Sequence, residues 1–433
     1  MTAAARVRSG EAWFGRPVRK LQPLGQDADA ELADLARNAE QAGATRLAKA
    51  LGGSGPLAAF LAAAIDLSPY VRDCLRLAPE IAERLFDTPL AARLEQIAGE
   101  IGALGTRAEF AEAELMRELR LCKREAHVLI ALGSLAGEAD CATTVRRLSA
   151  LAEASVRAAA SWLLRDAHGS GKLALPDPER AEFGSGWILL GMGKLGAHEL
   201  NFSSDIDLVA LFDPAAPAIV DPYDAADLFV RLTRRLVRIL QDRTEHGYVF
   251  RTDLRLRPDP GATPLAIPVE AALTYYESRG QNWERAAMIK ARPVAADLAA
   301  GERFLKELRP YVWRKYLDYA AIADVHSIKR QIHAHKGHGE IAVRGHNVKL
   351  GRGGIREIEF FVQTQQLIAG GRFPELRGQQ TVPMLAVLAE RGWITAEARD
   401  ALTAQYWFLR DVEHAIQMVA DEQTHNLPED DEG

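Results

Sequence analysis

The stretch Gly193-Lys-Leu-Gly-Ala-His-Glu-Leu-Asn-Phe-Ser-Ser-Asp-Ile-Asp207 lies between two apolar runs, residues 187–190 and 208–212. Short apolar runs bounded by glycine are typical of buried strands, and glycines between them favour a tight turn. The sequence therefore predicts a strand, a glycine-rich turn with a short irregular or helical piece, and a second strand that opens on two aspartates.

The two aspartates are expected to act together. Side chains two residues apart share one face of a strand, so Asp205 and Asp207 should project side by side while Ile206 turns into the core. Neighbouring carboxylates repel each other unless a cation lies between them. Because ligands that offer only oxygen suit Mg²⁺ or Mn²⁺ better than zinc, the pattern predicts a site for one of these two metals.

The turn before the aspartates is expected to bind an anion, since glycines let backbone N–H groups approach closely and a lysine adds positive charge. The candidate phosphate-binding residues are Gly191, Gly193, Lys194, Gly196, Ser203 and Ser204. Their spacing fits neither a Walker loop nor the dinucleotide fingerprint. A glycine-rich turn followed by Asp-x-Asp resembles the nucleotidyltransferase superfamily of DNA polymerase beta. The alternative is an ordinary turn and strand with solvated aspartates.

A third carboxylate is needed for phosphoryl transfer with two metal ions. Residues 248–257 alternate as a strand, which places Asp253 on one face with Arg251, Arg255 and Arg257. Asp253 is then either part of a plain salt-bridge ladder or the third metal ligand beside the first two aspartates. In the second case the arginines suit phosphate oxygens, which guanidinium groups bind in bidentate fashion.

Short motifs follow one another from about residue 117 to the end of the chain. They are Gly191-Met-Gly-Lys-Leu-Gly196, Asn201-Phe-Ser-Ser-Asp-Ile-Asp207, Arg251-Thr-Asp-Leu-Arg-Leu-Arg-Pro258, Trp283-Glu-Arg285, Lys290-Ala-Arg292, Gly353-Gly-Ile-Arg-Glu-Ile-Glu-Phe360, Val412-Glu-His414 and Gln423-Thr-His425-Asn-Leu-Pro428. In sequence and in order they are similar to those of the bifunctional glutamine synthetase adenylyltransferase/adenylyl-removing enzymes.

That resemblance implies a function. Enzymes of this family carry two catalytic units in tandem, and Asn201-Phe-Ser-Ser204 looks more like the first, adenylyl-removing unit. The implied reaction removes AMP from a tyrosine of glutamine synthetase with inorganic phosphate and gives ADP. Two Mg²⁺ ions would be held by Asp205, Asp207 and Asp253. The implied partners are glutamine synthetase, the PII signalling protein, phosphate and ADP or ATP, with control by glutamine.

Other functions stay open. The unit could add AMP from ATP, because phosphate attack and its reverse share one machinery. It could be a different nucleotidyltransferase that acts on a small molecule or an RNA end. It could also be a non-catalytic module that docks glutamine synthetase or PII, although an intact set of three acids speaks against this.

Composition narrows the class of protein. The 433 residues suffice for two or three domains, and the net charge of −6 argues against nucleic acid as the main partner. Cys74, Cys122 and Cys141 show neither pairing nor metal-ligand spacing, which favours a reducing cytoplasm. We find no run long enough to span a membrane and no signal peptide, so no membrane partner is expected.

The expected fold class is α+β and mostly helical: a polymerase beta-like nucleotidyltransferase domain with a mixed sheet, flanked by helical domains. The expected divisions are residues 1–165, 166–309, 310–425 and, for the start of an acidic linker, 426–433. Residues 223–242 are expected to form an amphipathic helix between the two aspartate strands. On a helix of the first domain, Arg117, Arg120, Lys123 and Arg124 are expected to form a solvated face. The alternative is a contact with an acidic partner or with the nucleotide.

Further basic residues are candidates for phosphate or nucleotide contact. Lys290 and Arg292 would both point toward the phosphates if they lay on a strand, and toward solvent if they lay on a surface helix. Residues 348–354 form an expected loop that brings Lys349 to the start of a helix over 355–369, on which Arg356 lies. The alternative for that helix is a charged face that only meets solvent.

Histidines gather in the same part of the chain, at positions 326, 333, 335, 338 and 346. Zinc would need further close ligands at fixed spacing, and no cysteine is near. We therefore expect a histidine-rich surface segment and assign no metal to it.

Overall fold

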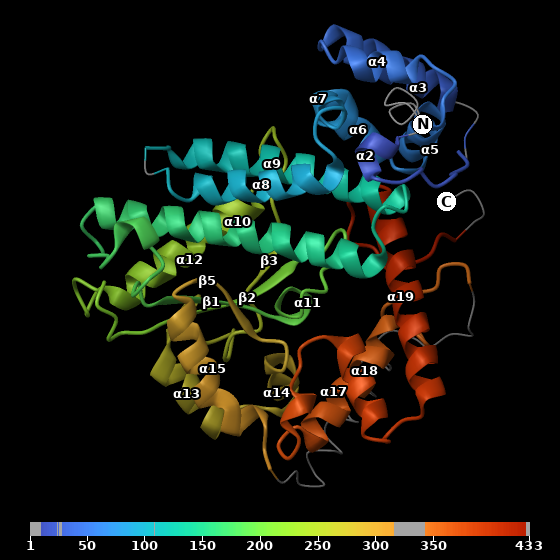
Figure 1. Cartoon of the computed structure of the whole chain (residues 1–433). Coiled ribbons are helices and arrows are strands. Elements are labelled where there is room, and N and C mark those ends of the chain that lie inside the picture. The colour runs from blue at the N-terminus through green and yellow to red at the C-terminus, as the bar shows by residue number, and fades with distance from the viewer. Residues whose placement is uncertain (1–9, 24, 26–27, 108, 316–342, 430–433) are drawn as a thin grey trace.

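The computed structural model describes residues 10–23, 25, 28–107, 109–315 and 343–429. Its first part is helical, as the sequence predicts. The helices are α2 (Glu11–Phe14), α3 (Ala28–Gln41), α4 (Thr45–Leu51), α5 (Pro56–Leu67), α6 (Pro69–Leu77), α7 (Glu80–Arg84), α8 (Leu90–Leu104), α9 (Glu112–Leu135) and α10 (Cys141–Gly169). In Figure 1, α2 to α7 form a lobe above the long helices α8, α9 and α10.

The central element is a small mixed sheet, and the predicted fold class of a mostly helical α+β protein is confirmed at this level. Its strands are β1 (Trp187–Gly191), β2 (Ile206–Phe212), β3 (Thr252–Asp253), β4 (Ala266–Pro268) and β5 (Arg292–Ala296). The order is β3-β2-β1-β5, with β4 also paired to β2. Strand β1 runs antiparallel to both of its neighbours, whereas β3 and β4 run parallel to β2.

Helices cover both faces of this sheet, which explains why β1 and β2 consist almost wholly of apolar residues. Alternate side chains of β1 enter two separate hydrophobic clusters. The first cluster includes α10 and α12 (Ala225–Gln241), and the second includes α13 (Val269–Ser278), α14 (Asn282–Met288) and α15 (Leu298–Val312). Figure 1 shows α10 and α12 above the sheet and α13 and α15 below it. The amphipathic helix predicted over 223–242 is confirmed as α12.

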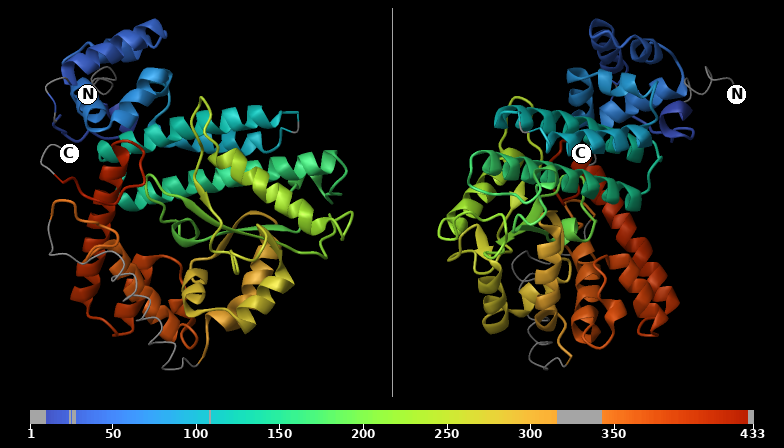
Figure 2. Two further views of the ribbon diagram at one scale, coloured as in Figure 1. Left: turned by 180° about the vertical axis from the view of Figure 1, so that it is seen from behind. Right: turned by 60° about the vertical axis from the view of Figure 1, so that its left-hand side comes forward.

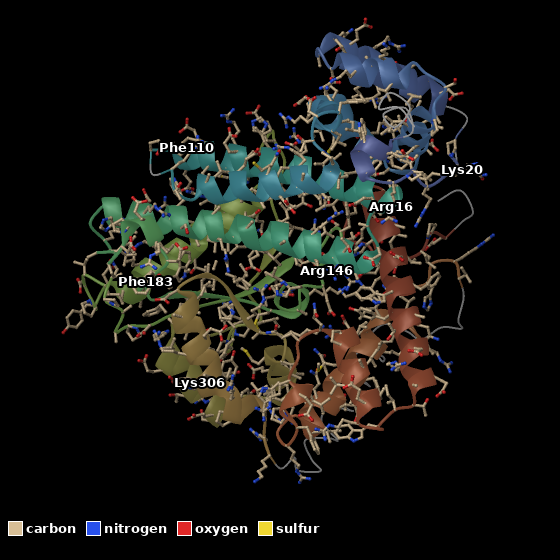
Figure 3. All side chains as sticks on the ribbon, viewed as in Figure 1. Arg16, Lys20, Phe110, Arg146, Phe183 and Lys306 are labelled. Atoms are coloured by element: carbon tan, nitrogen blue, oxygen red, sulfur yellow. The ribbon has the colours of Figure 1, made fainter. Side chains whose placement is uncertain are left out.

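The end of the chain returns to helix. It consists of α17 (Ile355–Ala369), a short 3-10 turn at Pro374–Leu376, α18 (Thr381–Glu390) and the long α19 (Ala396–Met418). Views from two further sides show that these helices stand beside the sheet and that α19 reaches up to the N-terminal helices (Figure 2). Exposed basic side chains such as Arg146 and Lys306 project from the outer surfaces of the helices (Figure 3).

The prediction of a strand over residues 248–257 is wrong except at its centre, because only the two residues of β3 form a strand there. The Asp253 carboxylate accepts hydrogen bonds from the backbone N–H and the guanidinium of Arg255. An aspartate that binds its own backbone two residues further on offers the chain a turn in place of a ladder. The guanidinium of Arg257 then donates to the carbonyls of Leu254 and Pro260 and holds this turn closed.

The solvated basic face predicted for α9 is also wrong in part. Arg120 is 1% exposed, and its guanidinium donates to the carbonyls of Ile239, Asp242 and Gly247. These carbonyls lie at and just beyond the C-terminal end of α12, where helical partners run out. Arg120 is therefore buried between α9 and α12 because its guanidinium caps the C-terminal end of α12.

Two of the expected domain limits fall inside helices. Residue 165 lies within α10 and residue 309 within α15, and one hydrophobic cluster contains side chains from both the N-terminal helices and the sheet. The division into domains stays a prediction. In the described part of the chain, no single helix is long and apolar enough to cross a membrane. The pair α4 and α5 passes the same test when taken together, by length and composition alone, but the two helices are bent by 90° at the break between them.

Candidate active site

A pocket of about 400 Å³ opens where the glycine turn, β2, β3, α14 and α17 meet. Its volume lies within the range of roughly 300–1,000 Å³ that is usual for sites of small molecules. The residues that line it are Gly193, Lys194, Ser204, Asp205, Asp207, Asp253, Arg255, Leu256, Asn282, Trp283, Ala286, Ala287, Lys290, Lys349, Arg356, Glu359, Phe360, Gln363 and Gln423.

Strand pairing brings the three predicted acids to this pocket. Asp207 on β2 and Asp253 on β3 are direct partners in the parallel register, and Asp205 immediately precedes β2. Burial, together with the charges of Asp253 and Asp205, raises the pKa of Asp207 to about 6. The raised pKa means that the charged form of Asp207 is disfavoured by its burial and by the two neighbouring carboxylates.

The other two acids have cationic or amide partners. The Asp205 carboxylate accepts from the Arg251 guanidinium at 2.8 Å and from the Gln423 amide at 3.0 Å. The hydrogen bonds of Arg255 lower the pKa of Asp253. With these partners in place, no three acidic, histidine or cysteine side chains of the described residues converge closely enough to hold a metal ion.

The glycines of the turn serve close packing, and only one of the three lines the pocket. Gly193 opens α11 (Gly193–Gly196) at a φ of 50°, where an added Cβ would lie 2.9 Å from an Asp207 carboxylate oxygen. A Cβ at Gly196 would lie 1.8 Å from the carbonyl oxygen of Lys290, and one at Gly191 would meet Val294 at 2.6 Å. Gly191 and Gly196 therefore let the turn pack against β5 and the chain before it.

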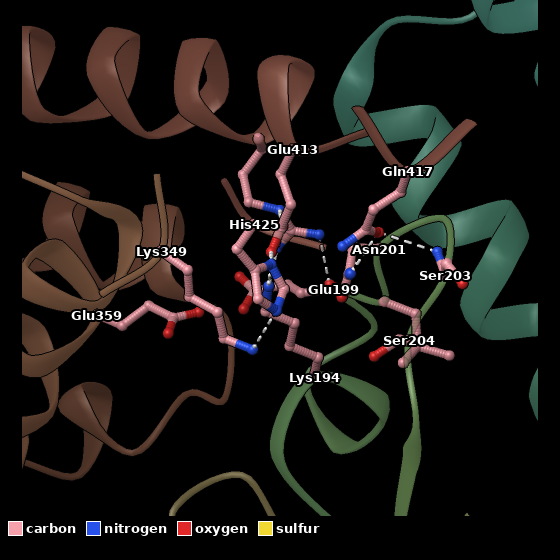
Figure 4. Close-up of polar contacts among 12 residues, drawn as sticks. Lys194, Glu199, Asn201, Ser203, Ser204, Lys349, Glu359, Glu413, Gln417 and His425 are labelled. Atoms are coloured by element: carbon pink, nitrogen blue, oxygen red, sulfur yellow. Dashed lines mark hydrogen bonds and ion pairs between the residues drawn. The ribbon is translucent and has the colours of Figure 1, made fainter. Parts of the chain in front are cut away.

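Lys194 reaches across the pocket to the last long helix. Its ammonium lies 3.1 Å from the Glu413 carboxylate on α19, an ion pair that is almost wholly buried. Burial, together with the charge of Arg410, lowers the pKa of Lys194 to about 8. His425 also contacts Glu413 at 3.1 Å, and Lys349 lies 3.4 Å from the far nitrogen of His425 (Figure 4).

A second buried group joins the sheet to the helices of the C-terminal part. The Lys290 ammonium donates to Glu199 at 3.0 Å and lies 3.8 Å from Glu359 of α17. Glu199 also accepts from the backbone N–H of Thr381 at the start of α18. Arg292, two residues further on, pairs with Glu153 of α10 at 2.8 Å and so points away from the pocket.

The two serines before Asp205 lie in different surroundings, since only the second lines the pocket. Ser203 is buried, and its N–H donates to the Gln417 side chain, which also binds Asn201 (Figure 4). Ser204 lines the pocket and donates to the carbonyl of Asp205. Gln417 of α19 thus fixes the approach to the aspartates from outside the sheet.

The pocket brings together ten of the predicted site residues and leaves five outside. The ten are Gly193, Lys194, Ser204, Asp205, Asp207, Asp253, Arg255, Lys290, Lys349 and Arg356. The five are Gly191, Gly196, Ser203, Arg257 and Arg292. Of the histidine-rich segment, His346 lies in a described turn, and the other four positions lie outside the described residues.

Several residues line the pocket without a site role predicted from the sequence, among them Asn282, Trp283, Glu359 and Gln423. A signal was present for most of them. Trp283, Glu359 and Gln423 stand inside motifs that carry the family resemblance. The pattern showed that these residues matter but not what they contact.

Comparison with known proteins defines the class. The family model described as Glutamate-ammonia ligase adenylyltransferase matches residues 58–307, which is more than half of the chain. The chain belongs to this family of nucleotidyltransferases. A second model, described as GlnD PII-uridylyltransferase, matches residues 326–433.

Individual relatives agree with the family. The chain is 72% identical over 432 residues to the bifunctional glutamine synthetase adenylyltransferase/adenylyl-removing enzyme of Mesorhizobium japonicum, covering 100% of this chain and 44% of the relative. It is 66% identical to the protein of the same name in Brucella melitensis over 425 residues, 97% of this chain and 43% of the relative. The chain thus spans less than half the length of these relatives.

Proposed function

We propose that this chain removes AMP from adenylylated glutamine synthetase with inorganic phosphate and releases ADP. The observation that carries the proposal is the pocket that Asp205, Asp207 and Asp253 line together with Lys349 and Arg356. A pocket lined by both acids and cations suits a phosphate-bearing substrate with a bound divalent metal. The names of the relatives supply glutamine synthetase as the protein substrate.

Mg²⁺ is the proposed metal, with Mn²⁺ as a possible substitute, and Asp205, Asp207 and Asp253 would hold two ions. The chemistry of the donor set fits, because it offers only carboxylate oxygen and because burial, followed by the charges of Asp253 and Asp205, raises the pKa of Asp207. Arg255 is 83% exposed in its side chain, so it can leave Asp253 at small cost. Bound metal would activate the attacking phosphate oxygen and stabilise the leaving tyrosine oxygen.

The basic residues of the chain would bind the phosphate groups. In the proposed reaction an oxygen of inorganic phosphate forms a bond to the phosphorus of AMP, the bond to the tyrosine oxygen breaks, and that oxygen takes up a proton. Lys349 and Arg356 line the same pocket as the acids and would neutralise charge on the two phosphates. Lys194 is paired with Glu413, so its share would be to hold α19 over the turn.

The fold of the catalytic part is proposed to be that of the polymerase beta superfamily, on the strength of the glycine turn, Asp-x-Asp and the mixed sheet. PII is the proposed regulatory partner, supported by the match of residues 326–433 to a family described as a PII-uridylyltransferase. The proposed location is the cytoplasm, where glutamine synthetase would be met.

The test is release of ADP from adenylyl-tyrosyl glutamine synthetase, measured with and without phosphate. We expect ADP only when phosphate and Mg²⁺ are both present. Release of free AMP at the same rate without phosphate would mean hydrolysis and would contradict the proposal.

A further inference from the structure

One wall of the pocket is apolar and has no part in phosphate chemistry. Leu256, Ala286, Ala287 and Phe360 line it, and all four pack against the hydrophobic cluster on the lower face of the sheet. The acids and cations described above line the other walls. The pocket therefore offers an apolar surface next to a charged one, which suits a ligand with the same two parts.

Trp283 extends this wall without belonging to the core. Its side chain lines the pocket and is 37% exposed, and it is absent from the hydrophobic clusters of the described residues. Tryptophan is highly buried on average, because leaving its large ring in water forgoes much hydrophobic stabilisation. Its indole N–H donates to the Gln281 side chain at 3.2 Å, which satisfies the polar edge and leaves the ring to the pocket.

The two residues that follow Trp283 explain how it is held there. Glu284 is 2% exposed and accepts from the backbone N–H of Gln281, which closes the N-terminal end of α14. Arg285 is 1% exposed and donates to the carbonyls of Tyr311 and Val312 at the end of α15. These two buried residues thus anchor the helix, and the Trp283 ring just before them stands out from a rigid support.

We infer that Trp283 is the stacking surface for the purine base of the nucleotide, with Phe360 on the same apolar wall. The inference rests on the proposed function, because it takes the nucleotide to be AMP before the reaction and ADP after it. A base on this wall leaves its phosphates toward Lys349 and the three acids. The side-chain amide of Gln363 lines the same pocket and offers hydrogen-bonding groups to the base edge.

The test compares a ligand that has a base with one that lacks it. We would measure the affinity for ADP and for pyrophosphate, both with Mg²⁺, by calorimetry on the parent chain, Trp283→Ala, Trp283→Phe and the control Trp393→Ala. Trp393 is 39% exposed and lies outside the pocket lining. Loss of base stacking on an aromatic side chain weakens binding by about 5- to 100-fold.

We expect Trp283→Ala to weaken the binding of ADP by about tenfold or more and to leave the affinity for pyrophosphate within about twofold of the parent value. Trp283→Phe should keep most of the ADP affinity while abolishing the ADP-induced change in tryptophan fluorescence, and it serves if the alanine variant does not fold. Equal weakening of both ligands, unchanged ADP affinity in Trp283→Ala, or no ADP binding by the parent chain would overturn the inference.

The outcome is separate from that of the proposed reaction, because no glutamine synthetase is present in the binding experiment. A chain that binds ADP through Trp283 but forms none from adenylylated glutamine synthetase would keep this inference and lose the proposed function. A chain that forms ADP while Trp283→Ala binds it normally would do the reverse.

Discussion

At the scale of single residues, the three acids of the pocket have the same side chain but unlike surroundings. Asp205 accepts from Arg251 and Gln423, Asp253 accepts from Arg255, and Asp207 is the one whose pKa is raised. If only the stability of the fold mattered, an asparagine in place of Asp207 would be more favourable than a buried carboxylate. An acid kept there points to a charged ligand, which is the part proposed for Mg²⁺.

Replacing Asp207 with asparagine, or Asp205 with asparagine, should abolish ADP release while leaving the fold intact. The physical reason is that each change removes a proposed metal ligand without removing core volume. Turnover at saturating Mg²⁺ and the melting temperature should be measured on one sample. Near-normal activity in either variant would contradict the assignment, and a melting temperature far below that of the parent would mark the residue as structural.

Asp207→Asn should also change how stability depends on pH. The folded pKa of about 6 exceeds the usual 3.8, so the folded chain binds more protons than the unfolded chain between these values. Stability of the parent therefore falls as pH rises from about 4 through 6. Without divalent metal, we expect the variant to be more stable than the parent by about 1–3 kcal/mol at pH 7 and nearly equal at pH 4.

Urea unfolding at both pH values measures this difference, and chelator must be present throughout. A variant that is less stable than the parent at pH 7, or a gain that is equal at pH 4, would show that Asp207 carries no unfavourable charge.

Asp253 has two interpretations that one pair of measurements separates. As a metal ligand, Asp253→Asn should lower the rate by several orders of magnitude. As a partner of Arg255, which is 83% exposed, it should cost about 1 kcal/mol of stability or less and little rate. We expect the large loss of rate with the small loss of stability, and Arg255→Ala is the matched control for the ion pair.

At the scale of elements, residues 419–425 after α19 join three parts of the molecule. The backbone carbonyl of Val419 accepts from Tyr70 of α6, and Asp421 pairs with Lys123 of α9 at 3.3 Å. Gln423 then donates to Asp205 in the pocket. The segment therefore connects the N-terminal helices directly to a proposed metal ligand.

A parallel set of contacts runs beside this segment. The Tyr248 hydroxyl donates to Asp421 at 3.0 Å and accepts from Arg251, which in turn donates to Asp205. Lys123 and Asp421 are only 6% and 10% exposed in their side chains. A buried ion pair of this kind is strongly destabilising when one partner is removed.

Lys123→Met should therefore destabilise the chain by about 3–5 kcal/mol and lower the rate, although Lys123 does not line the pocket. Lys123→Met combined with Asp421→Asn should recover most of the stability, because no charge is left unpaired. Arg117→Met is the matched control, since its side chain is 53% exposed on the same helix. Urea unfolding and ADP release give the two readouts; a loss no larger than that of the control would contradict a structural role for the pair.

Local pattern predicts the elements that local forces determine. The apolar runs around the glycine turn give β1 and β2, and the spacing of leucines gives α12. Pattern fails at residues 254–257, where the Asp253 side chain binds the backbone N–H of Arg255 and ends the strand. The prediction that Lys290 and Arg292 point the same way also fails, because β5 begins only at Arg292. Lys290 pairs with Glu199, whereas Arg292 pairs with Glu153.

At the scale of the whole molecule, the pocket depends on pairs that are far apart in the sequence. Lys194 meets Glu413, Lys290 meets Glu199 and Glu359, and Asn201 meets Gln417. No periodicity or spacing encodes such pairs, because they arise only when α17 and α19 pack beside the sheet. The sequence therefore identified the acids and the basic residues around them, but not the partners of Lys194 and Lys290 or the part that α19 plays.

The direction of the reaction is also a question for the whole molecule. The name of the relative from Mesorhizobium japonicum gives two opposed activities, and this chain covers 44% of that relative. The Asn201-Phe-Ser-Ser204 stretch resembles the adenylyl-removing unit, and Asn201 and Ser203 are both held by Gln417 next to the acids. We expect this chain to release ADP from adenylylated glutamine synthetase with phosphate and to add little AMP to the unmodified enzyme from ATP. Both rates should be measured with the same enzyme sample, with Asp207→Asn as the inactive control. Labelling of unmodified glutamine synthetase from ATP at a rate equal to or above that of removal would assign the chain to the adenylyl-adding activity instead.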